Sequence, residues 1–268
     1  MTRALIAAAL AAAVLAPPAA PAGEAWDGLR PQVFGERAIA PAGQRLSLST
    51  PYRSTDDASV EIGARIALPE GARATRLTLI IDENPVPVSA VVDLAEPRRT
   101  FRIALTMRLN GPSPVRALVE TADGRLMMRQ AMVKTSGQGA CAAPPGTDPE
   151  AALATLGEMR FRPHSAGSTA DRLAALRENA PAYGRLSISH PSHSGLQMDQ
   201  VTLLYLPAHY VETVAVREGG EPAFTLTGSI SLSENPEISF PHAPGPVQVR
   251  VTDSEGNVFE RTFGRGAS

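Results

Sequence analysis

The chain has 268 residues with 25 basic and 27 acidic side chains, so its formal charge is close to neutral, and it holds one cysteine. The basic residues are spread without a cluster, which argues against nucleic acid or anionic lipid as a partner. The length favours two domains over one.

The N-terminus has the pattern of a secretory signal peptide. Arg3 precedes an apolar run over residues 4–16, and Ala20-Pro21-Ala22 offers a cleavage site. The apolar run is shorter than the ~20 residues that a membrane span needs. We therefore expect a cleaved signal peptide over residues 1–22, export to the periplasm and no membrane attachment after cleavage.

Short alternating apolar and polar runs fill the first half of the mature chain. This period of two predicts strands over residues 60–68, 77–81, 88–94, 101–107 and 115–119. Asp123-Gly124 then lies between residues 115–121 and 125–133 as the turn of a hairpin. Several short strands at this spacing favour a β-sandwich over residues 23–136.

Small residues follow this half, and a short helix follows them. The segment around Cys141 reads Ser-Gly-Gln-Gly-Ala-Cys-Ala-Ala-Pro-Pro-Gly. Thr147-Asp148-Pro149 supplies an N-cap residue and a proline for the first turn, which predicts a helix over residues 149–156. We expect residues 137–157 to form a cysteine-bearing linker with this helix, and a second helix or helical loop over residues 168–178.

The strand pattern returns in the second half. It predicts strands over residues 186–190, 201–206, 211–216, 223–227, 247–251 and 258–263, with a turn at residues 253–256. A second β-sandwich is therefore expected over residues 158–268. The fold class is all-β, with two sandwich domains joined by a short, flexible and partly helical linker.

The two halves share a short motif. Asp82-Glu83-Asn84-Pro85 corresponds to Ser233-Glu234-Asn235-Pro236, and each is followed later by a strand, an acidic-glycine turn and a final strand. The repetition favours a common architecture. Because asparagine before proline favours an extended or turn conformation, we expect each motif to end a strand.

Cys141 is the residue with the clearest candidate chemistry. In an oxidising compartment an odd cysteine is a free reactive thiol or a site of intermolecular pairing. Gly137, Gly139, Ala140 and Ala142 remove steric bulk around it, so we expect a mobile arm that carries the thiol into another protein's active site. No basic residue adjoins it in the sequence, so we expect partner proteins to activate the thiol. The alternative is an incidental linker cysteine.

The histidines are weaker candidates. His190 and His193, with Cys141 and His164 elsewhere, are residue types that bind copper or zinc. Because His190 and His193 fall in a turn where no regular element directs both rings to one point, we expect a polar turn, with no metal and no cofactor. Two further histidines have apolar neighbours and are expected to pack or to lie at the surface, His209 and His242.

Enzyme templates are missing from the sequence. It has no nucleophile elbow, no His-Glu-x-x-His, no Cys-x-x-Cys, and Gly137-Gln138-Gly139 lacks the third glycine of a dinucleotide loop. No pair of carboxylates is specified by spacing. We therefore assign no catalytic residue and expect the chain not to be an enzyme.

These residues together resemble a known family. The first half resembles the SoxY subunit of the thiosulfate-oxidising carrier in Trp26, Phe34-Gly35, residues 81–85 and Asp123-Gly124, which lead to a small-residue segment with a cysteine. The second half is similar to the SoxZ subunit in residues 188–191, 194–199, 205–208, 228–236 and 253–256. The fusion resembles the SoxYZ-like carriers associated with quinoprotein dehydrogenases.

The resemblance implies two immunoglobulin-like sandwiches, a periplasmic location and a cysteine on a swinging arm that holds a sulfur intermediate for separate enzymes. Cys141 matches that cysteine, and residues 137–143 match the arm. The SoxY arm is a free C-terminal Gly-Gly-Cys-Gly-Gly, whereas this one has fewer glycines and is tethered at both ends, which reduces its reach. The implied partners are periplasmic redox enzymes, with a quinoprotein dehydrogenase and a cytochrome c as candidates.

Three hypotheses follow for the function. In the first, the chain is a periplasmic covalent carrier with Cys141 as its attachment site. In the second, it is a non-catalytic docking or assembly module for a periplasmic quinoprotein dehydrogenase, and the cysteine is incidental. In the third, it is a metal or electron-transfer protein that binds copper or zinc through His190 and His193.

Overall fold

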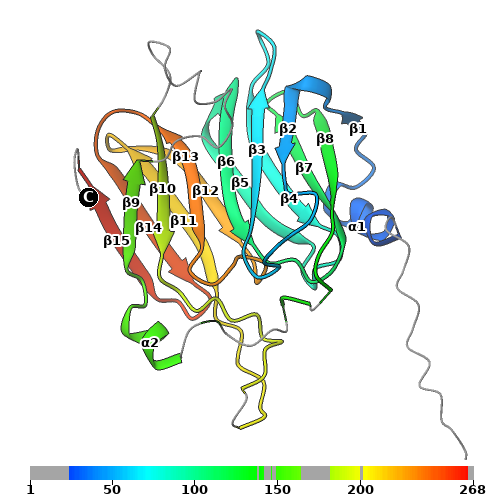
Figure 1. The fold of residues 1–268 in the computed structure, drawn as a ribbon. Helices are drawn as coiled ribbons and strands as arrows, with labels where there is room; N and C mark the ends of the chain where they lie inside the picture. Colours follow the sequence, from blue (N-terminus) through cyan, green and yellow to red (C-terminus); the bar gives the residue numbers. More distant parts are fainter. Residues whose placement is uncertain are drawn as a thin grey trace, which may run out of the picture.

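The computed structural model describes residues 24–137, 139–141, 146, 149–163, 182–199 and 202–264, and this part of the chain consists mainly of strands (Figure 1). The helices are α1 (Glu24–Phe34), the 3-10 turn η1 (Gly43–Arg45) and α2 (Pro149–Ala154). The strands of the first half are β1 (Ile39–Pro41), β2 (Leu46–Ser49), β3 (Val60–Ala67), β4 (Ala74–Ile81), β5 (Val88–Arg98), β6 (Thr100–Met107), β7 (Ser113–Thr121) and β8 (Leu126–Val133). Those of the second half are β9 (Met159–Pro163), β10 (Ala182–Ile188), β11 (Val211–Glu218), β12 (Glu221–Gly228), β13 (Glu237–His242), β14 (Val247–Asp253) and β15 (Val258–Phe263).

Two sheets face each other, and each sheet contains strands from both halves. The nine-stranded sheet has the order β1-β8-β7-β4-β5-β12-β11-β14-β15, and the six-stranded sheet has the order β2-β3-β6-β13-β10-β9. The halves join edge to edge, because β5 pairs with β12 and β6 pairs with β13, both antiparallel. The all-β sandwich class is confirmed, and the two sandwiches share continuous sheets instead of packing as separate bodies.

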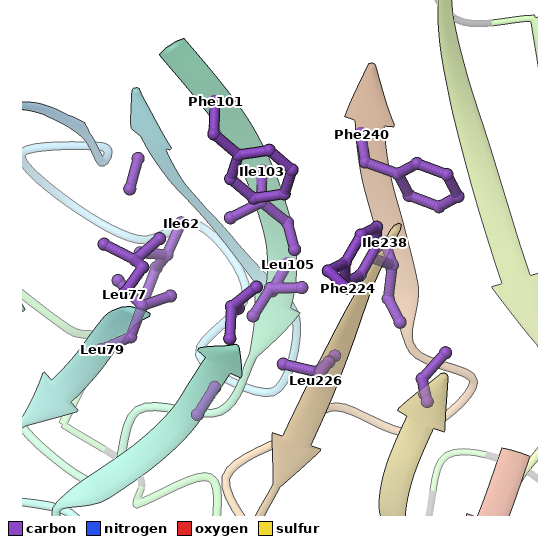
Figure 2. Packing of buried hydrophobic residues seen from close by; sticks show 14 of the residues in the cluster. Ile62, Leu77, Leu79, Phe101, Ile103, Leu105, Phe224, Leu226, Ile238 and Phe240 are labelled. Carbon is purple, nitrogen blue, oxygen red and sulfur yellow. The ribbon is translucent and has the colours of Figure 1, made fainter. Parts of the chain in front are cut away.

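The hydrophobic core continues across this seam. Phe224 on β12 lies edge-on to Phe101 on β6, with ring centroids 5.6 Å apart, and to Phe240 on β13, at 5.1 Å (Figure 2). All three rings are buried. Burying one such side chain contributes about 2 kcal/mol, so aromatic packing fixes one half on the other.

Most of the predicted strands are confirmed, and the exceptions are instructive. The strand expected over residues 201–206 is wrong, because residues 202–206 form a loop apart from an isolated bridge at Tyr205. Helix α2 agrees with the helix predicted from residue 149 onward. Helix α1 was not predicted, because Gly28 and Pro31 within it are typical of a turn.

Two sequence predictions fall on residues that the structure does not describe. They are the signal peptide over residues 1–22 and the helix or helical loop over residues 168–178. In the ranges that are described, no helix has the length and the apolar run that a membrane span requires.

Candidate functional site

Cys141 is buried between loops from the two halves of the chain. It is 0% exposed, and its carbonyl accepts a hydrogen bond from the Ser194 hydroxyl. One residue earlier, the Ala140 N–H donates to the Leu109 carbonyl at 3.3 Å. The thiol-bearing segment is therefore docked against the loop after β6 on one side and the loop after β10 on the other.

The sequence predicts a mobile arm that carries the thiol to other proteins, and the structure describes this arm in a docked position with the thiol buried. Small side chains were expected to give the arm freedom, yet here they let the backbone approach the neighbouring loops closely, and Ala140 is buried as well. Gly137 and Gly139 have φ angles of 95° and 67°, which L side chains rarely adopt, so both glycines serve to turn the chain. Ala142 lies outside the described residues.

Arg108 places a buried positive charge at the same site. Its Nη1 donates to the carbonyls of Ser192 at 2.7 Å and Leu232 at 2.5 Å, and the residue is 2% exposed. Burial raises the pKa of the Cys141 thiol, and the charge of Arg108 opposes this rise. The docked thiol is therefore protonated at neutral pH and is a poor nucleophile until its surroundings change.

Sequence reasoning missed Arg108, because no spacing rule connects it to the cysteine. It follows the apolar strand β6 directly, at the point where a charged residue usually marks a strand end at the surface. Pairing of β6 with β13 carries it under the second half, where its N–H donates to the Ser231 carbonyl at 2.7 Å. The hydrogen bond from the Ala140 N–H to the Leu109 carbonyl holds the thiol segment next to Arg108, and loops of the second half cover both.

The two Asn-Pro motifs hold the docking loops in matching ways. Asn84 Oδ1 accepts a hydrogen bond from the Asn110 N–H at 2.9 Å, and Asn235 Oδ1 accepts one from the His190 N–H at 3.0 Å. Asn84 Nδ2 also donates to Ser231 Oγ at 2.9 Å, across the seam. Each asparagine therefore fixes one of the two loops that enclose the thiol. The first motif follows the end of β4, as predicted, whereas the second lies directly before the start of β13.

The His-Pro-Ser-His turn directs its two rings to different partners. His193 Nδ1 lies 3.2 Å from Gln197 Oε1, whereas the His190 ring lies edge-on to the His209 ring with centroids 4.5 Å apart. His209 Nε2 is 2.7 Å from Asp253 Oδ2, and His190 Nε2 is 3.5 Å from the same oxygen. The sequence analysis missed this trio, since His190 and His209 lie far apart in the connection between β10 and β11, and Asp253 is the last residue of β14.

The trio is a buried network in which His209 and Asp253 are hydrogen bonded, while His190 Nε2 has no hydrogen-bond partner in the described structure. His190, His209 and Asp253 place candidate ligand atoms within 4.8 Å of one another. However, the Ser192 N–H donates to His190 Nδ1 at 2.9 Å, so Nε2 carries the proton of the neutral ring and does not offer a lone pair to a metal. Burial, followed by repulsion from His209, lowers the pKa of His190 to about 4 and keeps that ring neutral.

Asp253 is the anchor of this network. Burial opposes ionisation of its carboxyl group, but hydrogen bonds from Asn257 and His209 outweigh burial and lower its pKa to about 2. The carboxylate thus organises the turn between β14 and β15 while it binds His209. Of the remaining histidines, His164 lies outside the described residues, and His242 packs against Phe161 with centroids 5.2 Å apart.

The loop that follows the His-Pro-Ser-His turn exposes a group of apolar side chains. Backbone hydrogen bonds pair residues 197–199 with residues 204–206. At its tip Leu203, Leu204 and Tyr205 are 67%, 69% and 66% exposed. Leu203 also has a φ of 59°, a conformation that costs a non-glycine residue about 1 kcal/mol.

Family models match both halves of the chain. The model for the sulfur oxidation protein SoxY matches residues 30–141, and that for the sulphur oxidation protein SoxZ matches residues 172–264. The SoxY match ends at Cys141. No curated protein sequence matches the chain.

Solved structures with some likeness include the sulfur carrier protein SoxY from Chlorobium limicola f thiosulfatophilum, which is 22% identical over 41% of this chain and 94% of that chain, with a TM-score of 0.36. A β-glycosidase from Bacteroides vulgatus is 8% identical over 82% of this chain and 24% of its own, with a TM-score of 0.24. Scores this low carry no argument about function. The two family matches divide the chain between them, and the structure joins the matched halves through shared sheets. The chain is therefore a SoxYZ-like protein in which a SoxY domain and a SoxZ domain are fused.

Proposed function

We propose that the protein is a periplasmic carrier that holds a sulfur intermediate covalently on Cys141 while partner enzymes act on it. The observation that carries this proposal is the position of the chain's single cysteine, at the end of the SoxY match and enclosed by loops from both halves. The chain itself catalyses nothing and supplies the scaffold, the protected thiol and the surfaces on which partners dock.

Loading requires the thiol to leave its docked position. The contacts from Ser194 to the Cys141 carbonyl and from Ala140 to Leu109 break, and the thiol reaches solvent, where its pKa falls. Cys141 then loses its proton, its sulfur forms an S–S bond with the sulfane sulfur of a thiosulfate-like anion, and two electrons pass to a partner redox protein. A cytochrome c is the candidate acceptor.

Arg108 is placed to stabilise a negatively charged group on Cys141 when the arm is docked. Its buried charge is balanced in the described structure by backbone carbonyls, with no carboxylate bonded to it. A buried cation of this kind favours an anion beside it. We infer that the charge of Arg108 stabilises the anionic end of the group on Cys141 when the arm returns to its dock.

Replacement of the cysteine tests the carrier proposal. Cys141→Ser should abolish sulfur-compound oxidation in cells, while the purified variant keeps the wild-type circular dichroism spectrum and melting temperature. The matched control is Ser47→Ala, at an exposed position on β2. Wild-type oxidation by Cys141→Ser would remove the carrier function.

The exposed loop favours a second candidate function, a docking or assembly module for a periplasmic quinoprotein dehydrogenase. Leu203, Leu204 and Tyr205 form an apolar tip that the described part of the chain leaves exposed. In this case Leu204→Ser with Tyr205→Ser should abolish binding of the dehydrogenase, and Cys141→Ser should not affect it. Val258→Ser, at another exposed apolar side chain, is the matched control.

A further inference from the structure

Buried oxygen atoms without hydrogen-bond partners gather where the arm leaves β8. Ser54, Asp57 and Thr135 are each 6% exposed. Ser54 Oγ, Asp57 Oδ1 and Thr135 Oγ1 are fully buried and have no partner in the described structure. Burying such atoms unpaired costs free energy, and most buried polar groups in folded proteins have a partner.

Backbone pairing brings Ser54 and Thr135 together. The Lys134 N–H donates to the Tyr52 carbonyl at 2.9 Å, and the Ser54 N–H donates to the Lys134 carbonyl at 2.7 Å. These two bonds form a parallel bridge that centres on Arg53 and Lys134, so Ser54 and Thr135 are the next residues in register.

Asp57 is tied to the same segment. The Ser136 N–H donates to Asp57 Oδ2 at 2.8 Å, and the Ser136 hydroxyl donates to the same oxygen. The Leu109 N–H donates to the Asp57 carbonyl at 2.9 Å, which links this group to the loop that docks the thiol. Ser54, Asp57 and Thr135 therefore form one cluster, the root cluster, at the base of the arm.

The charge of Asp57 determines whether water or a cation is the better ligand for the root cluster. One carboxylate oxygen is satisfied by Ser136, whereas the other has no donor, and no basic side chain in the described ranges forms an ion pair with Asp57. Lys134 turns away, with its Nζ 4.9 Å from the centre of the exposed Tyr52 ring. A water molecule would complete the hydrogen bonds but leave the carboxylate charge of Asp57 unbalanced. A cation would coordinate the oxygen atoms and balance that charge.

We propose that the root cluster binds a hard cation of the calcium class. A carboxylate and two hydroxyls are oxygen ligands, which calcium accepts in irregular geometry with water completing its coordination, whereas magnesium demands near-octahedral geometry. The bound ion ties Thr135, at the start of the arm, to residues 54–57. It restricts the pivot of the arm and takes no part in the chemistry of the thiol.

Calcium titration of the full mature chain, first stripped with a chelator, tests the proposal. Calorimetry should show one site, and the melting temperature should rise by several degrees at about 100-fold the Kd. Asp57→Asn keeps the shape of the side chain and should abolish both signals, and Ser54→Ala should weaken calcium binding about tenfold. Asp56→Asn is the control, because this exposed neighbour accepts from the Ala58 N–H and should bind calcium as the wild type does.

Other results would overturn the proposal. The first is that no calcium binds at millimolar concentration, which would mean that water occupies the cluster. The second is that Asp57→Asn binds calcium as tightly as the wild type. The third is that sodium chloride at matched ionic strength raises the melting temperature as much as calcium does. If Asp57→Asn fails to fold, Ser54→Ala and Thr135→Val decide in its place. Cys141→Ser should bind calcium normally, so failure of the carrier function and failure of the cation site are separable.

Discussion

Arg108 and Cys141 are both buried where the two halves meet, and the charge of Arg108 opposes the rise that burial imposes on the pKa of the thiol. One residue belongs to β6 and its loop, while the other follows the last strand of the same half, and the second half covers both. The docked thiol is consequently shielded from solvent, while the nearby charge limits the rise in its pKa. In the proposed carrier, release of the arm is the step that creates the nucleophile.

Substitution of Arg108 should separate its charge from its packing. Arg108→Met removes the charge and leaves three carbonyl contacts without a donor, so the thiol pKa should rise further and the stability should fall by about 2–3 kcal/mol. Arg108→Lys keeps the charge and should hold the thiol pKa closer to that of the wild type. The thiolate is measured by its ultraviolet absorbance against pH, with Cys141→Ser as the blank and the exposed Arg65→Met as the control. Equal thiol pKa values in the Met and Lys variants would contradict an electrostatic role.

Ser194 should control how often the thiol leaves its dock. Ser194→Ala removes the hydroxyl that donates to the Cys141 carbonyl. A lost hydrogen bond of about 1 kcal/mol corresponds to roughly fivefold faster alkylation of the native protein. The rate is measured with a maleimide under native conditions, and Ser47→Ala serves as the control. An unchanged rate in Ser194→Ala would show that this contact does not hold the arm.

Asn235 combines a side-chain contact with an unusual backbone conformation. Its φ is 45°, and its amide oxygen accepts from the His190 N–H. Asn235→Gly keeps the backbone conformation and loses the side-chain contact, so we expect a loss of about 1 kcal/mol. Asn235→Ala adds the strain of a positive φ and should lose about 2 kcal/mol. Urea unfolding measures both variants, and a reversed order would contradict this account.

Much of the fold is predictable from the sequence, because period-two alternation is a local signal. It locates strands such as β3, whose side chains alternate over most of its length. The same signal fails at residues 202–206, where an apolar run forms an exposed loop. Nothing local to that run distinguishes a strand from a surface loop, since the difference lies in whether another strand pairs with it.

The candidate site was predictable only in part. The single cysteine among small residues indicates its own importance, but its burial depends on Ser194 and on Leu109, both distant in the sequence. The sharing of sheets through β5 and β12 is equally long-range, because strand patterns do not encode which edge a strand joins. Contacts of this kind appear only once the register between the halves is known.

The stability of the protein should depend on pH through His190. Its pKa is about 4 in the folded protein, against 6.5 for an ordinary histidine, so between these values the unfolded chain binds a proton that the folded chain does not. Stability should therefore fall as the pH drops from 6.5 toward 4, by about 3 kcal/mol in all. His190→Gln should flatten this slope in urea unfolding, and the control His242→Gln should not. Identical slopes in the two variants would contradict a neutral buried His190.

The central claim is that Cys141 carries a covalent sulfur group, and mass spectrometry of the native exported chain tests it most directly. The protein is purified without reductant from cells that are oxidising sulfur compounds, and the intact mass and the Cys141 peptide are measured before and after reduction. A reductant-sensitive adduct on Cys141 is the expected result. A uniformly bare thiol in cells with an active pathway would contradict the carrier function.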